Sequence, residues 1–262
     1  MYAVVRWTVW QRRWSIVWWC LGMAALIGLT LGLYPSIRDQ ANQLNRSFNL
    51  SGSTLDLFGG TDFFSPVGYL NSQLIYFTVP LVLAILAIGL GTSLIGREES
   101  SGTLEALLAR PVSRGKLLTA KAIAGMLIIF IVISVSSAVV LGLCKAVSMG
   151  IPLGYVAAAC FACFMLVLTF GASAFLLTVT GRGRVAALGV AVAYGMGGYL
   201  VSSLAPSVPW LKNPSLLFPY HYYQTAGILR GTFLWRDIAF FALFTAGCGV
   251  LAWLSFRRRD LS

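Results

Sequence analysis

Charged residues are scarce in this sequence. They make up 10% of its 262 residues, whereas hydrophobic residues make up 58%. Soluble domains carry about 25% charged residues, so the composition excludes a water-soluble globular protein and predicts an integral membrane protein. The net charge of +11 would suggest nucleic-acid binding in a soluble chain. Here the cations flank apolar runs, which indicates membrane topology and no nucleic-acid partner.

Signals for catalysis or cofactor binding are also few. The chain has one His and five Cys, and the C-x-x-C formed by Cys160 and Cys163 lies in an apolar run, as expected of small buried residues. We therefore expect no metal site and no cofactor. The phosphate-binding pattern G-x-x-x-x-G-K-[ST] is absent, because Gly115-Lys116 is followed by Leu117. Any ATP and Mg²⁺ would then be bound by a partner subunit.

Long apolar runs dominate what remains. A helix needs about 20 apolar residues to cross the ~30 Å hydrocarbon core, and six runs qualify. They are 15–34, 73–96, 122–143, 153–180, 185–205 and 237–256. Backbone polar groups have no water partner in lipid, so these runs must be helical. They lack Asp, Glu, Lys and Arg near the bilayer centre, which argues against an ion-coupled carrier. The prediction is an all-α integral membrane protein, one transmembrane domain over residues 1–262.

The cations are distributed unequally between the two sides of the membrane. Thirteen Lys and Arg flank one side and six the other. Because the cytoplasmic side carries the excess, both termini are predicted to be cytoplasmic. We expect the chain in the plasma membrane of a bacterium, in contact with lipid.

The N-terminus predicts an amphipathic helix on the inner membrane surface. At about 100° per residue, its tryptophans share one side and its arginines the other. These residues are Trp7, Trp10, Trp14 and Trp18 against Arg6, Arg12 and Arg13. The alternative is an early start of the first spanning helix.

Two outer links are long. Residues 35–72 predict a short amphipathic helix followed by a Gly/Ser/Asp-rich loop. Residues 206–236 are rich in Pro and aromatic residues. Tyr and Trp favour the membrane interface, so this second link is predicted to re-enter the membrane between helices five and six.

The inner link 97–121 carries a helix signal of its own. Ser100 and Ser101 can cap a helix, Leu104 and Leu108 give it one apolar side, and Pro111 ends it. A solvated loop has no need of these leucines. We therefore predict a short cytoplasmic helix, between spanning helices two and three, that docks into a partner.

The run Glu98-Glu99-Ser100-Ser101-Gly102-Thr103-Leu104-Glu105-Ala106-Leu107-Leu108-Ala109-Arg110-Pro111 resembles the signature loop of permease subunits of type-2 ATP-binding-cassette (ABC) exporters. The resemblance implies that this loop is a coupling helix, which inserts into a separate nucleotide-binding ATPase subunit. The residues expected to face that subunit are Glu98, Glu99, Gly102, Thr103, Leu104, Glu105 and Arg110, with Arg6 and Arg13 beside them.

The same resemblance implies two permease copies, identical or similar, and two ATPase subunits. Its substrate path runs between the permease copies along spanning helices one, two and five. Candidate path residues, chosen from helix position, are Leu29, Leu33, Phe77, Leu81, Tyr194 and Tyr199. An apolar path suits export of an amphipathic or hydrophobic antibiotic, peptide or lipid-like molecule.

Two other function classes remain beside the exporter. One is an immunity or sensing permease, which protects against an antimicrobial without carrying it far. The other is an intramembrane serine protease, with Ser173 in Gly171-Ala172-Ser173-Ala174 as nucleophile and His221 as base. Ser173 lies deep in helix four and His221 in the outer link, so close helix packing by small residues is favoured over catalysis.

Overall fold

The computed structural model describes residues 2–37, 65–100, 114–181 and 183–258. In these ranges the regular structure is helical, and six segments are long and apolar enough to cross a membrane. The main spanning helices are α2 (Arg13–Gly32), α6 (Thr78–Ser100), α8 (Arg114–Ala146), α9 (Leu153–Val179), α10 (Arg184–Leu204) and α13 (Trp235–Arg258). The predicted all-helical fold with six spanning helices is confirmed.

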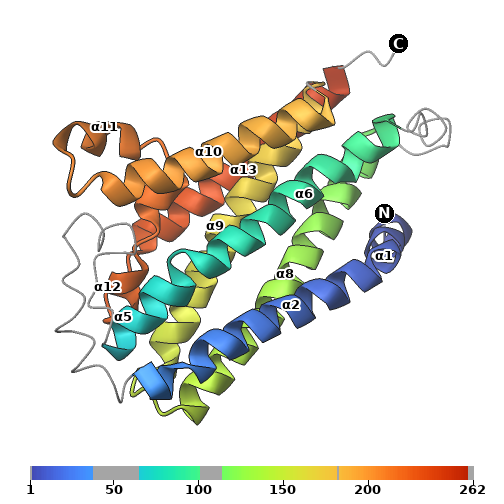
Figure 1. Ribbon diagram of the computed structural model, residues 1–262. Coiled ribbons are helices and arrows are strands. Elements are labelled where there is room, and N and C mark those ends of the chain that lie inside the picture. The colour runs from blue at the N-terminus through green and yellow to red at the C-terminus, as the bar shows by residue number, and fades with distance from the viewer. Residues whose placement is uncertain (1, 38–64, 101–113, 182, 259–262) are drawn as a thin grey trace.

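Helix α9 forms the centre of the bundle. It packs against α6, α13, α8 and α10, and Figure 1 shows it passing between α6 and α13. Its side chains Val156, Leu166 and Phe170 are fully buried. The outer helices α2, α10 and α13 bury far less of their surface within the chain. Their exposed apolar faces are those that lipid or a partner must cover.

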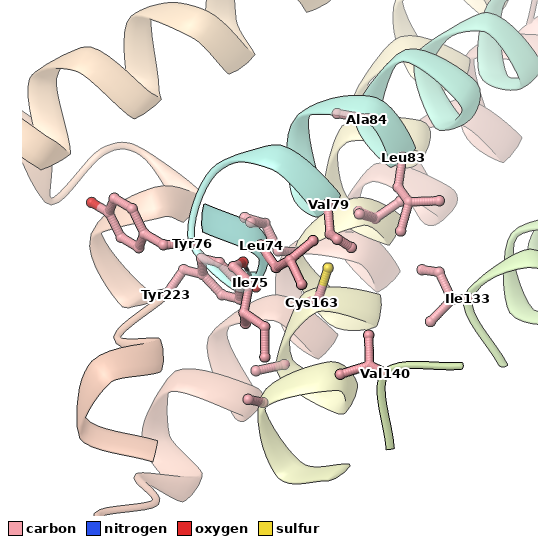
Figure 2. Packing of buried hydrophobic residues seen from close by; sticks show 14 of the residues in the cluster. Leu74, Ile75, Tyr76, Val79, Leu83, Ala84, Ile133, Val140, Cys163 and Tyr223 are labelled. Carbon is pink, nitrogen blue, oxygen red and sulfur yellow. Dashed lines mark hydrogen bonds between the residues drawn. The ribbon is translucent and has the colours of Figure 1, made fainter. Parts of the chain in front are cut away.

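Glycine permits the closest approach in this centre, between α6 and α9. A Cβ added to Gly91 on α6 would lie 2.5 Å from the carbonyl oxygen of Gly171 on α9. Small residues allow backbones in a membrane to come this close, where dispersion contacts and not the hydrophobic effect hold helices together. Farther along, Leu74, Ile75, Val79 and Leu83 pack toward side chains of α8 and α9 (Figure 2).

The second spanning segment begins earlier than residue 73, where the sequence placed it. It starts with α5 (Pro66–Leu70), continues through a π-helix, η1 (Asn71–Ile75), and then becomes α6. Ser65 caps α5 by accepting a hydrogen bond from the backbone N–H of Gly68 at 3.0 Å. The polar Asn71 made this stretch resemble a loop. It is instead fully buried, because Thr225 donates a hydrogen bond to its Oδ1 at 2.6 Å.

Helix α8 is also longer than the predicted span 122–143. Its 33 residues extend about 50 Å at ~1.5 Å per residue, well beyond the hydrocarbon core. This extension includes two lysines, of which Lys116 is exposed and Lys121 pairs with Glu98. The helix therefore projects past the membrane.

The N-terminus forms the predicted separate helix, α1 (Tyr2–Gln11), which turns away from α2 at Arg12 (Figure 1). It packs against α8. Nη2 of Arg12 donates to Oγ of Ser93 on α6 at 2.8 Å, and Arg13 stacks 4.2 Å from the ring centre of Trp10. The four tryptophans of the predicted aromatic face are 60–70% exposed, as a surface that meets lipid requires.

The link between α10 and α13 folds back on the bundle. It contains η2 (Pro209–Leu211), α11 (Lys212–Ser215), η3 (Pro219–Tyr222) and α12 (Thr225–Leu229). Elements η3 and α12 contact α9, and α12 also contacts η1. The link thus packs against the helix bundle, and its re-entry into the membrane stays a prediction. The amphipathic helix expected after residue 37 and the coupling helix of residues 101–113 lie outside the described residues.

Candidate functional site between helices α6 and α10

An apolar groove of about 170 Å³ separates the second spanning segment from α10. Phe77, Leu81 and Ile85 line one wall at intervals of four residues, which places them on one helical face. Val192, Met196 and Tyr199 line the other wall at the same kind of spacing. Ile85, Val192 and Met196 are exposed, so the groove opens on the outside of the chain.

Three of the six candidate path residues share this groove. Phe77 and Tyr199 face one another with ring centres 4.9 Å apart, and Leu81 lies one turn farther along. Tyr194 is held elsewhere, because its hydroxyl donates to the carbonyl oxygen of Leu217 at 3.0 Å.

The other two candidate path residues lie on α2, where Leu29 and Leu33 are 72% and 59% exposed. Helix α2 packs against α8, on the opposite side of α6 from α10 (Figure 1). One chain therefore does not bring all six residues together.

A cluster of four tyrosines lies at one end of the groove, which two of them, Tyr199 and Tyr220, line. They come from the second spanning segment, from α10 and from the link after it, and are Tyr76, Tyr199, Tyr220 and Tyr223. Ring centres within this tyrosine cluster are 5.3–6.4 Å apart. That range is typical of favourable aromatic pairs.

The hydroxyls of Tyr76, Tyr220 and Tyr223 are buried, and each has a hydrogen-bond partner, as burial requires. Tyr76 shares a 2.8 Å bond with Ser203 of α10. Tyr223 donates to the carbonyl oxygen of Ile75 at 2.7 Å and Tyr220 to that of Tyr76 at 3.4 Å. Figure 2 shows Tyr223 lying beside Ile75. The cluster thus joins three separate parts of the chain.

The π-helix sets the position of Tyr76. The Tyr76 N–H bonds to the carbonyl oxygen of Asn71 at 2.8 Å, one residue farther back than in an α-helix. Asn71 Nδ2 and Ser72 Oγ are buried and find no partner among the described residues. Buried polar groups of this kind and π-turns both occur at functional sites more often than elsewhere.

A polar cavity of about 500 Å³ lies beyond the tyrosine cluster and shares Tyr76, Tyr220 and Tyr223 with it. Lys212 and Gln224 are exposed at its wall. His221 Nδ1 forms a 3.0 Å hydrogen bond with Ser215 Oγ. Burial lowers the pKa of His221, an effect that Asp237 opposes and Arg236 reinforces. The imidazole is therefore neutral at pH 7.

The two residues of the protease hypothesis have different partners. Ser173 Oγ donates to the carbonyl oxygen of Phe170 at 2.9 Å, whereas His221 pairs with Ser215. A helical Ser bonded to its own preceding turn is a common structural arrangement. Among the described residues, the hydrogen bonds of Ser173 and His221 do not form the nucleophile–base pair that catalysis needs.

The described residues also define the frame of the predicted coupling helix. Helix α6 ends at Ser100 and α8 begins at Arg114. Near these ends Lys121 Nζ donates to Oε1 of Glu98. Of the residues predicted to contact an ATPase subunit, Arg6 and Arg13 are exposed, and Figure 1 shows α1 at the same end of the bundle as the end of α6. Gly102, Thr103, Leu104, Glu105, Arg110 and the side chain of Glu99 lie outside the described part.

Sequence reasoning missed Asn71, Tyr76 and Lys121. The spacing of Tyr76 and Phe77 before an apolar run offered no sign of a cluster, since the other tyrosines lie more than 100 residues away. For Lys121 a signal existed. Residues 98 and 121 carry opposite charges and lie on either side of the loop, where an ion pair joins the two flanking helices.

A family model described as "ABC-2 family transporter protein" matches residues 10–261, so this chain belongs to the ABC-2 transporter family. No curated protein matches the sequence. The chain is accordingly a multi-pass membrane permease of the ABC-2 type, a transport component that is not itself catalytic. Membership of this family implies association with an ABC ATPase subunit.

Proposed function

We propose that this permease exports an amphipathic or hydrophobic molecule from a bacterial cell and that the α6/α10 groove receives it. The observation that carries the proposal is the position of the groove. It is apolar along two helical faces, open on the outside of the chain, and separated by the tyrosine cluster from a polar cavity. An antibiotic, a peptide or a lipid-like molecule has both the apolar and the polar parts to use these two environments.

A second permease copy would complete the path, because the groove faces out of the chain. Leu29 and Leu33 on α2 are free to line the same path from the neighbouring copy, since they too point outward. Two ATPase subunits would supply the energy, each binding ATP and Mg²⁺ and receiving one coupling helix.

Movement of α10 relative to α6 is the step that the contacts suggest. The bond between Tyr76 and Ser203 crosses from one helix to the other, whereas Tyr220 and Tyr223 bond to carbonyl groups of the second spanning segment. Closure of the ATPase subunits would shift the helices, break the Tyr76–Ser203 bond and open a route from groove to cavity.

The test compares Phe77→Ala and Tyr199→Ala with Phe130→Ala in proteoliposomes that contain the ATPase subunit from neighbouring genes. Phe130 is a suitable control because it is exposed on α8, away from the groove. We expect the two groove variants to lose substrate-stimulated ATPase activity and transport, each by about tenfold, which corresponds to ~1.4 kcal/mol of binding free energy. The control should match the parent protein.

Unchanged transport of every candidate substrate by both groove variants would remove these residues from the path. Binding of an antimicrobial without transport would instead support the immunity or sensing function.

A further inference from the structure

A second groove runs along the opposite side of the bundle, between α8 and α13. Leu118, Ala122 and Met126 of α8 form one wall, and Thr245, Gly249 and Trp253 of α13 form the other. Both sets recur every four residues and so lie on single helical faces. The floor is made by α6 and α9 where these two helices are closest. The groove holds about 90 Å³ of empty space.

The lining of the α8/α13 groove suits an apolar occupant. Besides the Trp253 indole, its side-chain polar groups are two threonine hydroxyls, and that of Thr119 is already bonded to carbonyl oxygens of its own helix at 3.0 and 3.2 Å. Water needs two to four polar partners to occupy a buried site. In a spanning helix bundle, the apolar molecule available at such a face is an acyl chain of the bilayer.

The length of the groove matches one leaflet. Its α8 wall extends from Leu118 to Ile129, which is about 16 Å at ~1.5 Å per residue. Half of the ~30 Å hydrocarbon core is about 15 Å. The occupant is therefore the length of one chain in one leaflet, and the groove ends near the bilayer centre.

The end of the groove that is formed by Leu118 and Trp253 carries positive charge. Trp253 lies against the backbone of α8, since a Cβ added to Gly115 would be 2.8 Å from its Nε1. The Arg257 guanidinium stacks 4.6 Å from the ring centre of Trp253, and Lys116 is exposed on α8 two residues before Leu118, where the groove begins. Cations beside an interfacial tryptophan are the groups that meet anionic headgroups at the cytoplasmic leaflet.

We propose that the α8/α13 groove binds one anionic phospholipid of the cytoplasmic leaflet, with an acyl chain along Gly249 and the phosphate beside Lys116 and Arg257. The site lies between α8 and α13, apart from the α6/α10 groove, and the proposal holds whether or not the chain exports the substrate suggested above. It rests on the cytoplasmic placement of the C-terminal end of α13.

Gly249 and Gly247 supply a matched pair for the test. A Cβ added at either position meets nothing within 4 Å, and both residues are exposed on α13, but only Gly249 lines the groove. The variants Gly249→Leu and Gly247→Leu are reconstituted in vesicles of phosphatidylethanolamine and phosphatidylglycerol and extracted again in mild detergent. Native mass spectrometry then counts the lipids that each chain retains.

We expect the parent protein and Gly247→Leu to retain one phosphatidylglycerol per chain, and Gly249→Leu to lose it by about tenfold, a change of ~1.4 kcal/mol. The double variant Lys116→Gln/Arg257→Gln should still retain a lipid but without preference for phosphatidylglycerol. Equal retention by the two leucine variants, or a parent protein without bound phosphatidylglycerol, would overturn the proposal.

A second measurement covers the case in which Gly249→Leu does not fold. Brominated phosphatidylglycerol quenches the fluorescence of nearby tryptophans. The difference in quenching between the parent protein and Trp253→Phe isolates the contribution of Trp253. A contribution that saturates at a lower fraction of brominated phosphatidylglycerol than of brominated phosphatidylethanolamine supports the site, and equal curves for the two lipids contradict it.

Discussion

Lys121 on α8 donates a hydrogen bond to Glu98 near the end of α6, and this ion pair joins the two helices on either side of the predicted coupling helix. The side chains are only 9% and 21% exposed. The pair is therefore more shielded from water than a surface salt bridge, and it holds the two ends of the loop together.

The first prediction concerns this ion pair. Lys121→Met removes one cation from the partly buried carboxylate of Glu98, and we expect a loss of about 1–2 kcal/mol in stability, below the ~3–5 kcal/mol of a fully buried pair. Thermal unfolding in detergent measures the loss. The reversed pair Glu98→Lys/Lys121→Glu should regain part of it, and equal unfolding temperatures for the single and reversed variants would argue against a pairwise interaction.

A second prediction addresses the coupling helix. Leu104→Arg or Glu105→Lys should weaken association with the ATPase subunit by about tenfold, or ~1.4 kcal/mol, while all six helices remain inserted. Co-purification of the two subunits and substrate-stimulated ATPase activity measure the effect. Full assembly together with normal stimulation in both variants would show that the coupling helix lies elsewhere.

The close approach of α6 and α9 gives a third prediction. Gly91→Ala would place its methyl group 2.5 Å from the carbonyl oxygen of Gly171, so we expect a loss of about 1–3 kcal/mol from overpacking. Gly89→Ala is the matched control, because a Cβ there meets nothing within 4 Å. It should be neutral or slightly stabilising, since Ala favours helix over Gly. If both variants unfold at the same temperature, this contact does not limit the packing.

His221 predicts how stability responds to pH. Its pKa is lowered by burial in the native state, so between that value and about 6.5 the unfolded chain binds more protons, and stability rises with pH. Asp237, Arg236 and Lys212 are the charged groups near it. Because His221 is the single histidine of the sequence, the unfolding temperature should fall from pH 7.5 to pH 5.5. His221→Gln should flatten this dependence, and an equally steep slope in the variant would assign it to other groups.

The apolar runs determined the spanning helices well, because a run of about 20 such residues has no other structure in lipid. The predicted ends of these helices are wrong where a polar residue has a partner far away in the sequence. Asn71 looked like part of a loop, but it bonds to Thr225, 154 residues away. Lys121 looked like a residue at the membrane edge, but it pairs with Glu98. Pairing across such separations is a tertiary property that a local pattern does not contain.

The candidate path residues likewise show what a local pattern predicts and what it does not. Phe77 and Tyr199 were chosen from helix position, and they lie in one groove because both helices present one apolar face. Tyr194 was chosen on the same ground, but its hydroxyl turns to the carbonyl oxygen of Leu217. Helical periodicity indicates which face a residue occupies. It does not indicate which hydrogen-bond acceptor lies within reach of that face.

The π-helix of Asn71–Ile75 takes up one residue of chain length without turning the helices on either side of it. A π-turn holds one residue more than an α-turn, so the extra residue is accommodated within the turn, and α5 and α6 keep the register of a continuous α-helix. Tyr69 therefore stays on the side of α2, where it donates to the carbonyl oxygen of Thr30 at 2.6 Å. Deleting one residue of this turn would restore α-helical winding and leave that contact in place, but it would remove the bond from the Tyr76 N–H to the carbonyl oxygen of Asn71.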